Sequence, residues 1–348
     1  MTAAPFLPTC AALLLTGLLA ACAGGPHAHH AGRPVADATP AVALQVQVLE
    51  LAGRPLRLTR SAATPAHAPV VVFVPGLGQD SDAGARWVAA WAAAGYAVLS
   101  VQPRAEDAAA WRSELARQGE FRELGRLHQG EAAQRERLAA LQQLLTRLRQ
   151  PGDAPWSGWD WGQVVLAGYE LGAQTVLDWR AADDGWQPRA VIAISPPPMR
   201  PATTLPALLI TSDADGDPLG LVNRPAERLR SFDALAPGQA WLLDLPAVSH
   251  AGLAGNLVSE AWAAQDQHRG GDFIGGGGGR RGQGGGANGG GGEGGGRAAG
   301  APPRGPRAGS ATEAALADLR PALRLSVVFA DRVRQGLPAP ADPLLRAR

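Results

Sequence analysis

The chain has 348 residues, of which 46% are hydrophobic, so it can form a large core and is not a wholly disordered protein. Its 32 basic and 31 acidic residues give a formal charge of +1, and we therefore expect no general attraction to nucleic acid. Both cysteines, Cys10 and Cys22, lie near the N-terminus, which excludes a disulfide framework or a cysteine-ligated metal site in the rest of the chain.

The N-terminal residues predict a targeting segment followed by a tether. Residues 6–21 form an apolar run that is too short to span a bilayer and has the length of a secretory signal. The run ends in Leu19-Ala20-Ala21-Cys22, which resembles the lipobox of bacterial lipoproteins, although no Arg or Lys precedes it. The resemblance implies that residues 1–22 are a signal and that a lipid on Cys22 anchors the protein to a membrane of the cell envelope, on the periplasmic or extracellular side. Plain secretion and an uncleaved start are the alternatives, and residues 23–41 are expected to be a flexible tether.

Residues 42–269 and 311–337 are expected to form one domain in which strands and helices alternate. Residues 70–74 are a continuous apolar run, which is typical of a strand covered on both faces. Strands are predicted at 42–51, 54–60, 70–74, 96–101, 163–167, 189–194, 207–211 and 240–245, and helices near 87–92 and at 105–130, 131–150, 172–182, 223–235 and 313–335. This alternation predicts an α/β fold with a mostly parallel, twisted sheet and helices on both faces. Ligands of such sheets bind beyond the carboxyl ends of the strands.

Residues 270–310 interrupt this pattern with a segment rich in Gly and Arg. Such a segment buries too little apolar area to offset its chain entropy, so we expect a disordered insertion in the domain. Its Arg-Gly pairs resemble RNA-binding segments, but no aromatic residues are interleaved with them for base stacking. We therefore expect no nucleic-acid partner.

The strand predicted at 163–167 runs into Gly168-Tyr169-Glu170-Leu171-Gly172 and then into a helix. Strand, sharp turn and helix are the context of the nucleophile elbow G-x-S-x-G, whose glycines allow a tight turn and whose central side chain is presented above the sheet. The central residue of this chain is Glu170 instead of serine.

Two further residues complete the pattern of a catalytic triad. Asp215 follows the strand predicted at 207–211, and His250 follows the strand predicted at 240–245, so the order along the chain is elbow, acid and histidine. Asp213 and Asp217 are alternative choices for the acid. Leu77, in the loop after residue 74, and Leu171, directly after the elbow residue, are placed to supply the two backbone N–H groups of an oxyanion hole.

These motifs resemble the α/β-hydrolase superfamily, and within it the secreted bacterial hydrolases related to dienelactone hydrolases, chlorophyllases and cutinases. The resemblance covers residues 68–255 and 313–335 and implies a carboxylic-ester hydrolase that acts on a small ester or a polymer. It implies neither a cofactor nor a metal. Similar proteins have His where this chain has Pro75, His where it has Tyr169 and Ser where it has Glu170.

Three hypotheses for Glu170 follow from the lost serine. A serine-esterase mechanism is excluded, because attack of a carboxylate on an ester carbonyl would give an anhydride. In the first hypothesis the protein is a degenerate or weakly active hydrolase, or a non-catalytic binding protein, in which Glu170 pairs with His250. In the second hypothesis Glu170 attacks a saturated carbon, as the elbow Asp does in haloalkane dehalogenases and epoxide hydrolases, although Glu is one methylene longer. The third is a mechanism of another kind. Ser195 and Ser212 are not expected to replace the missing nucleophile, since prolines follow the first and the second belongs to the acid loop.

Other features are weaker candidates. Trp156, Trp159 and Trp161 precede a strand and are expected to pack at the sheet edge, with stacking on a sugar or an aromatic polymer as the alternative. The charged residues of 105–130 are expected to form the solvated face of a helical cap over the site. The histidines of the tether, at 27, 29 and 30, are expected to be incidental and not metal ligands. The sequence leaves the substrate and the oligomeric state open.

Overall fold

The structure is a computed structural model that describes residues 42–152, 154–181, 184–256 and 308–348. The predictions for Cys22, for the signal, for the tether and for the insertion up to residue 307 lie outside the described residues. Residues 308–310, which the sequence placed in the insertion, already belong to a helix. None of the helices in the described ranges has both the length and the apolar character needed to cross a membrane.

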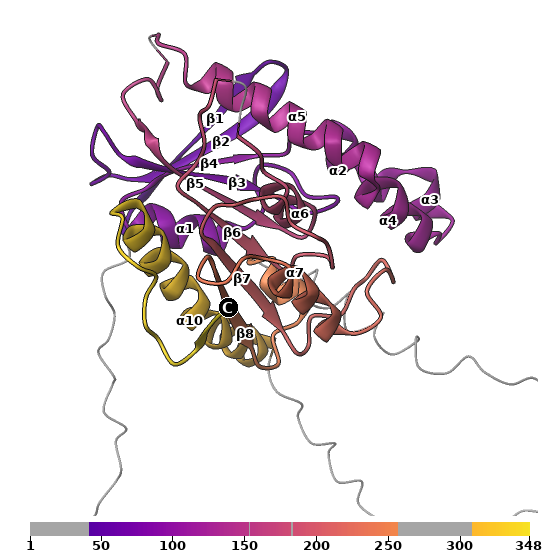
Figure 1. The fold of residues 1–348 in the computed structure, drawn as a ribbon. Coiled ribbons are helices and arrows are strands. Elements are labelled where there is room, and N and C mark those ends of the chain that lie inside the picture. The colour runs from indigo at the N-terminus through magenta and orange to yellow at the C-terminus, as the bar shows by residue number, and fades with distance from the viewer. Residues whose placement is uncertain (1–41, 153, 182–183, 257–307) are drawn as a thin grey trace, which may run out of the picture. The chain divides into compact units, whose positions relative to one another are not determined.

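In the described part of the chain, nine strands form one sheet in the order β1-β2-β4-β3-β5-β6-β7-β8-β9 (Figure 1). Neighbours from β4 to β8 are parallel, whereas β1, β2 and β9 join antiparallel. The prediction of an α/β fold with a mostly parallel sheet is confirmed. The strands are β1 (Leu44–Leu51), β2 (Arg54–Ser61), β3 (Pro69–Val74), β4 (Ala97–Val101), β5 (Asp160–Tyr169), β6 (Ala190–Ile194), β7 (Ala207–Ser212), β8 (Ala240–Leu245) and β9 (Leu345–Ala347).

Apart from a short helix at 250–253 that was not predicted, the helices fall where the sequence predicted them, but several are shorter or divided. The α-helices are α1 (Ala85–Ala93), α2 (Ala105–Ala109), α3 (Glu114–Arg117), α4 (Phe121–Gln129), α5 (Glu131–Leu148), α6 (Leu171–Leu177), α7 (Leu229–Asp233), α8 (His250–Leu253) and α10 (Ala308–Arg334). Two 3₁₀ helices, η1 (Ala110–Arg112) and η2 (Pro225–Arg228), precede α3 and α7. The sequence did not predict β9, which extends the domain beyond residue 337.

The two faces of the sheet carry separate apolar cores, which follow the alternation of side chains along each strand. Val70, Val72 and Val74 of β3 pack in one core with α5 and α6, while Val71 and Phe73 pack in the other with α1 and α10. Figure 1 shows these helices on opposite faces of the sheet. Strands covered on both faces explain the continuous apolar runs of the sequence.

The tryptophans at the start of β5 are part of the packing at the end of the sheet far from residue 170. Trp156 and Trp159 are buried in the core, and Trp161 packs against it half-buried. The Trp161 indole N–H donates to the carbonyl oxygen of Trp156 at 3.1 Å. This arrangement fits the expected packing role.

The strand order reverses beside β3, and this point positions the candidate site. The chain goes from β3 to β4 on one side and then places β5 on the other side of β3. Ligands of open α/β sheets bind at such a switch point, outside the carboxyl ends of the strands. The loop after β3 contains Leu77, and the turn after β5 contains Glu170.

Candidate active site

The turn between β5 and α6 has no room for side chains at its two glycines. A Cβ atom on Gly168 would lie 2.2 Å from the carbonyl carbon of Gly172, and one on Gly172 would lie 1.8 Å from the carbonyl oxygen of Val74. Since these neighbours are backbone atoms, a larger residue at either position would have to displace the chain. The glycine spacing therefore marks a sharp turn pressed against the end of β3, as the sequence predicted.

Glu170 lies between these glycines with a strained backbone and a buried side chain. Its dihedral angles are φ 51° and ψ −108°, a combination that costs a non-glycine residue about 1–3 kcal/mol. Its Oε2 atom accepts a hydrogen bond from the backbone N–H of Leu77 at 3.1 Å. Among the described contacts, none joins the carboxylate to the amide of Leu171. Glu170 thus occupies one of the two predicted oxyanion donors with its own carboxylate.

The Glu170 side chain is buried, although the sequence predicted an elbow side chain that is presented above the sheet. We use "the cap" for residues 105–129, which contain α2, η1, α3 and α4. The Trp111 indole N–H donates to the carbonyl oxygen of Leu77 at 3.1 Å. Leu77 and Leu171 pack with buried residues of the cap and with Leu219, and only 6% of Glu170 is exposed.

Asp215 and His250 form a hydrogen-bonded pair beside this turn. The Nδ1 atom of His250 lies 2.7 Å from Oδ1 of Asp215. Asp213 and Asp217, the alternative acids, accept backbone N–H groups in loops instead. The Tyr169 hydroxyl donates to the carbonyl oxygen of His250 at 2.9 Å, which holds the histidine next to the turn. The structure therefore brings residues 170, 215 and 250 to one edge of the sheet.

Two further side chains at this pair were not predicted. Arg228 is buried, and its Nε lies 3.0 Å from Oδ2 of Asp215. The Ser195 hydroxyl donates to Oδ1 of Asp215 at 2.9 Å and lies 3.0 Å from Nδ1 of His250. Ser195 is therefore on the Asp215 side of the imidazole ring, away from Nε2. It braces the acid and is not placed as a nucleophile, which agrees with the sequence expectation.

The charges around Asp215 keep it ionised. Burial raises the pKa of its carboxyl, but the hydrogen bond with His250 and the positive charge of Arg228 outweigh that effect and lower the pKa below its ordinary value. The carboxylate accepts a hydrogen bond from Nδ1–H, so the imidazole in this tautomer has its lone pair on Nε2. This is the tautomer that a general base requires.

The expected ion pair between Glu170 and His250 is wrong. In the described ranges, His250 pairs with Asp215, and no ion pair joins it to Glu170. The reason is geometric: the Glu170 side chain turns towards the loop after β3, where the Leu77 amide binds it.

A buried charge cluster joins the cap to α5, although the sequence predicted a solvated face for the charged residues of the cap. Asp107 and Arg137 are fully buried, with 2.6 Å between Nε of Arg137 and Oδ2 of Asp107. Nδ1 of His128 lies 2.7 Å from Oδ1 of Asp107. The backbone carbonyl of Asp107 accepts the N–H of Gly78 at 2.7 Å, so this cluster also anchors the loop that contains Leu77.

The fold and this site define an α/β protein with a carboxylate at a strained strand-to-helix turn, next to an Asp–His pair. No family model and no curated protein matches the chain. In the part of the chain that the structure describes, no three His, Cys, Asp or Glu side chains are grouped so that they could hold a metal ion.

The buried carboxyl of Glu170 predicts a pH-dependent stability. Burial raises its pKa, and the charge of His250 and the Leu77 amide oppose this only in part. The folded state thus binds the proton more tightly than the unfolded state, so this contribution to stability is complete below the unfolded pKa and is lost as the pH rises through the folded pKa. We expect the Tm of Glu170→Gln to exceed that of the wild type by a margin that grows from pH 4.5 to pH 8 in thermal unfolding. A margin that shrinks with pH would contradict this.

Proposed function

We propose that this chain is a member of the α/β-hydrolase superfamily whose elbow carboxylate closes its own oxyanion hole. The protein then hydrolyses carboxylic esters very weakly or not at all. Three arrangements support membership: the glycine-flanked turn after β5, the loop after β3 at the switch point, and the chain order of Glu170, Asp215 and His250.

The hydrogen bond from Leu77 to Glu170 carries this proposal. In an ester hydrolase the corresponding N–H binds the oxygen of the tetrahedral intermediate, and loss of one such donor costs about 10²–10³ in kcat. Here Oε2 of Glu170 takes the donor at 3.1 Å, and the side chain has no hydroxyl that could form an acyl-enzyme. Loss of a triad member alone costs about 10⁴–10⁶ in rate. The two losses together leave a scaffold with an intact Asp215–His250 pair and no ester chemistry.

The same hydrogen bond favours a second candidate, a carboxylate nucleophile. With Oε2 held by Leu77, Oε1 is the oxygen that would attack a saturated carbon. The carbon–halogen bond would break as the alkyl ester of Glu170 forms, and halide would leave. Water deprotonated by His250 would then hydrolyse the ester. The 6% exposure of Glu170 and its extra methylene weigh against this candidate.

The predicted lipobox adds to this proposal a location of the protein at the cell envelope. If Cys22 is acylated, the domain is tethered to a membrane of the cell envelope through residues 23–41. Its ligand would then be a small ester or a polymer that reaches the cap from the periplasmic or extracellular side.

Hydrolysis of p-nitrophenyl acetate and butyrate by the purified full chain tests the proposed function. We expect wild type, His250→Ala and Glu170→Gln to give the same rates, close to that of buffer, because none of them has a competent nucleophile. Strong wild-type turnover that Glu170→Gln abolishes would overturn the degenerate scaffold. Halide release from 1-bromobutane that is lost in Glu170→Gln would support the second candidate instead.

A further inference from the structure

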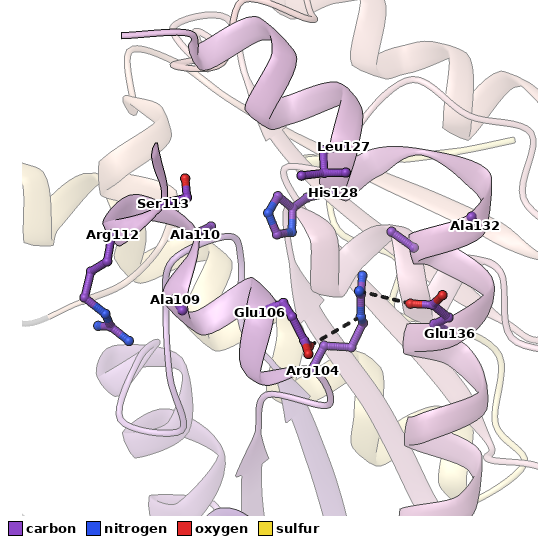
Figure 2. A pocket seen from close by; sticks show the side chains of 11 residues that line it. Arg104, Glu106, Ala109, Ala110, Arg112, Ser113, Leu127, His128, Ala132 and Glu136 are labelled. Atoms are coloured by element: carbon purple, nitrogen blue, oxygen red, sulfur yellow. Dashed lines mark ion pairs between the residues drawn. The ribbon is translucent and has the colours of Figure 1, made fainter. Parts of the chain in front are cut away.

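A cavity lies between the cap and α5, and Arg104 and residues of both elements line it. Its volume is about 540 Å³, within the range typical of small-molecule sites. Five of its eleven lining residues are apolar: Ala109, Ala110, Leu127, Ala132 and Ala133. In Figure 2, His128 lies between Ala110 and Ala132, and Arg104 lies below it beside Glu106 and Glu136. The cavity thus combines apolar side chains with polar and charged ones, among which Arg104 and His128 mark two separate positions.

Arg104 is a fixed cation at one of these positions. Its side chain is only 17% exposed, and its Nη1 lies 3.7 Å from Oδ1 of the buried Asp107, which holds it in place. Its other partners, Glu106 at 3.8 Å and Glu136 at 3.0 Å, are 64% and 65% exposed. Exposed ion pairs contribute only about 0–1 kcal/mol each, so an incoming carboxylate can displace both glutamates at little cost.

His128 supplies the second position. Its Nδ1 is bound to Asp107, which is fully buried and ionised, because hydrogen bonds from His128 and Arg137 outweigh the effect of burial and lower its pKa. Asp107 holds the ring through Nδ1, and Arg137 holds the backbone of the same residue by donating to the His128 carbonyl oxygen at 2.7 Å. Because Nδ1 donates to Asp107, the neutral ring presents Nε2 as a hydrogen-bond acceptor. Such an atom binds a hydroxyl group.

We infer that this cavity binds a short aliphatic hydroxycarboxylate. The carboxylate takes the place of the glutamates on Arg104, the hydroxyl donates to Nε2 of His128, and the hydrocarbon chain lies on the apolar side chains of the lining. The inference is independent of the proposed function, since no residue of the Glu170 site lines the cavity. The two are connected structurally, because Asp107 anchors both His128 and the loop that contains Leu77.

Calorimetry with the full chain and 3-hydroxyoctanoate tests the inference. We expect a Kd of about 1 mM or tighter. Octanoate, which lacks the hydroxyl, is expected to bind about fivefold more weakly. Arg104→Gln is expected to weaken binding of 3-hydroxyoctanoate about tenfold, because a charge-assisted hydrogen bond is lost. Arg135→Gln is the matched control, because the Arg135 guanidinium pairs with Glu131 on the same helix, outside the cavity. The affinity of this variant for 3-hydroxyoctanoate should equal that of the wild type.

A second pair of variants tests, without a change of charge, whether the ligand binds in this cavity. Ala132→Trp fills the cavity and is expected to abolish binding, whereas Ala139→Trp, two turns further along α5 and outside the lining, should bind as the wild type does. Both positions are exposed, so neither substitution disturbs the core. Absence of binding by the wild type, or equal binding by Ala132→Trp and Ala139→Trp, would overturn the inference. Octanoate that binds as tightly as 3-hydroxyoctanoate would refute the role of His128.

Discussion

Glu170→Ser is expected to create ester hydrolysis in a protein that, as we propose, has little or none. The substitution does two things at once: it removes the carboxylate from the Leu77 amide, and it places a hydroxyl at a turn whose strained backbone is already formed. His250 is placed to act as the general base, because Asp215 binds its Nδ1 atom at 2.7 Å. Arg228 and Ser195 in turn hold the Asp215 carboxylate. We expect kcat/KM for p-nitrophenyl butyrate to rise at least about 10²-fold, a part of what a complete triad supplies.

Two controls separate the nucleophile from the opened site. Glu170→Ala clears the Leu77 amide but offers no hydroxyl, so it should remain near the background rate. Glu170→Ser combined with His250→Ala should lose most of the gain, because the serine then has no base. If the single serine variant is no faster than Glu170→Ala, the three residues do not form a latent triad.

Asp107→Asn is expected to lower the free energy of unfolding by about 3–5 kcal/mol, the usual effect of removing one partner from a buried ion pair. Arg137 is fully buried, and its Nε lies 2.6 Å from the Asp107 carboxylate. Without the negative charge of Asp107, the buried Arg137 guanidinium loses the carboxylate with which it pairs. Its remaining hydrogen-bond partners are then Gln134 and the backbone carbonyl of His128. Urea denaturation of the two proteins measures the difference.

Glu136→Gln is the matched control for this effect. Glu136 of α5 forms an ion pair with Arg104 near the same cluster, but its side chain is exposed, so the change should stay within about 0.5 kcal/mol of the wild type. An Asp107→Asn variant that is as stable as Glu136→Gln would show that the buried cluster does not hold the cap.

Much of the framework could be predicted from the sequence because it depends on local patterns. Apolar runs that end in glycine predicted β3 and β5, and the spacing of Gly168 and Gly172 predicted a turn that has no room for a Cβ atom. Asp215 and His250 each follow a strand in the sequence. Because the carboxyl ends of parallel strands meet at one edge of a sheet, the two residues could be expected to lie together. These inferences need only neighbours in the chain or in the sheet.

The remaining features depend on long-range packing, which no local pattern encodes. Arg228 is one of several arginines in a short segment, and its burial against Asp215 follows only from how η2 folds back onto β7. Asp107 lies in a helix of five residues whose periodicity is too short to indicate a buried face. The direction of the Glu170 side chain depends on the loop after β3, whose Leu77 amide is 93 residues away in the sequence. β9 has three residues and therefore no detectable alternation.

The chemical shift of the Leu77 backbone amide proton tests the central claim most directly. If the Glu170 carboxylate binds this N–H, the resonance should lie downfield in the wild type, should titrate together with the Glu170 carboxyl carbon, and should move upfield in Glu170→Ala. A Leu77 resonance that does not respond to pH and is the same in Glu170→Ala would show that the carboxylate does not occupy the oxyanion donor.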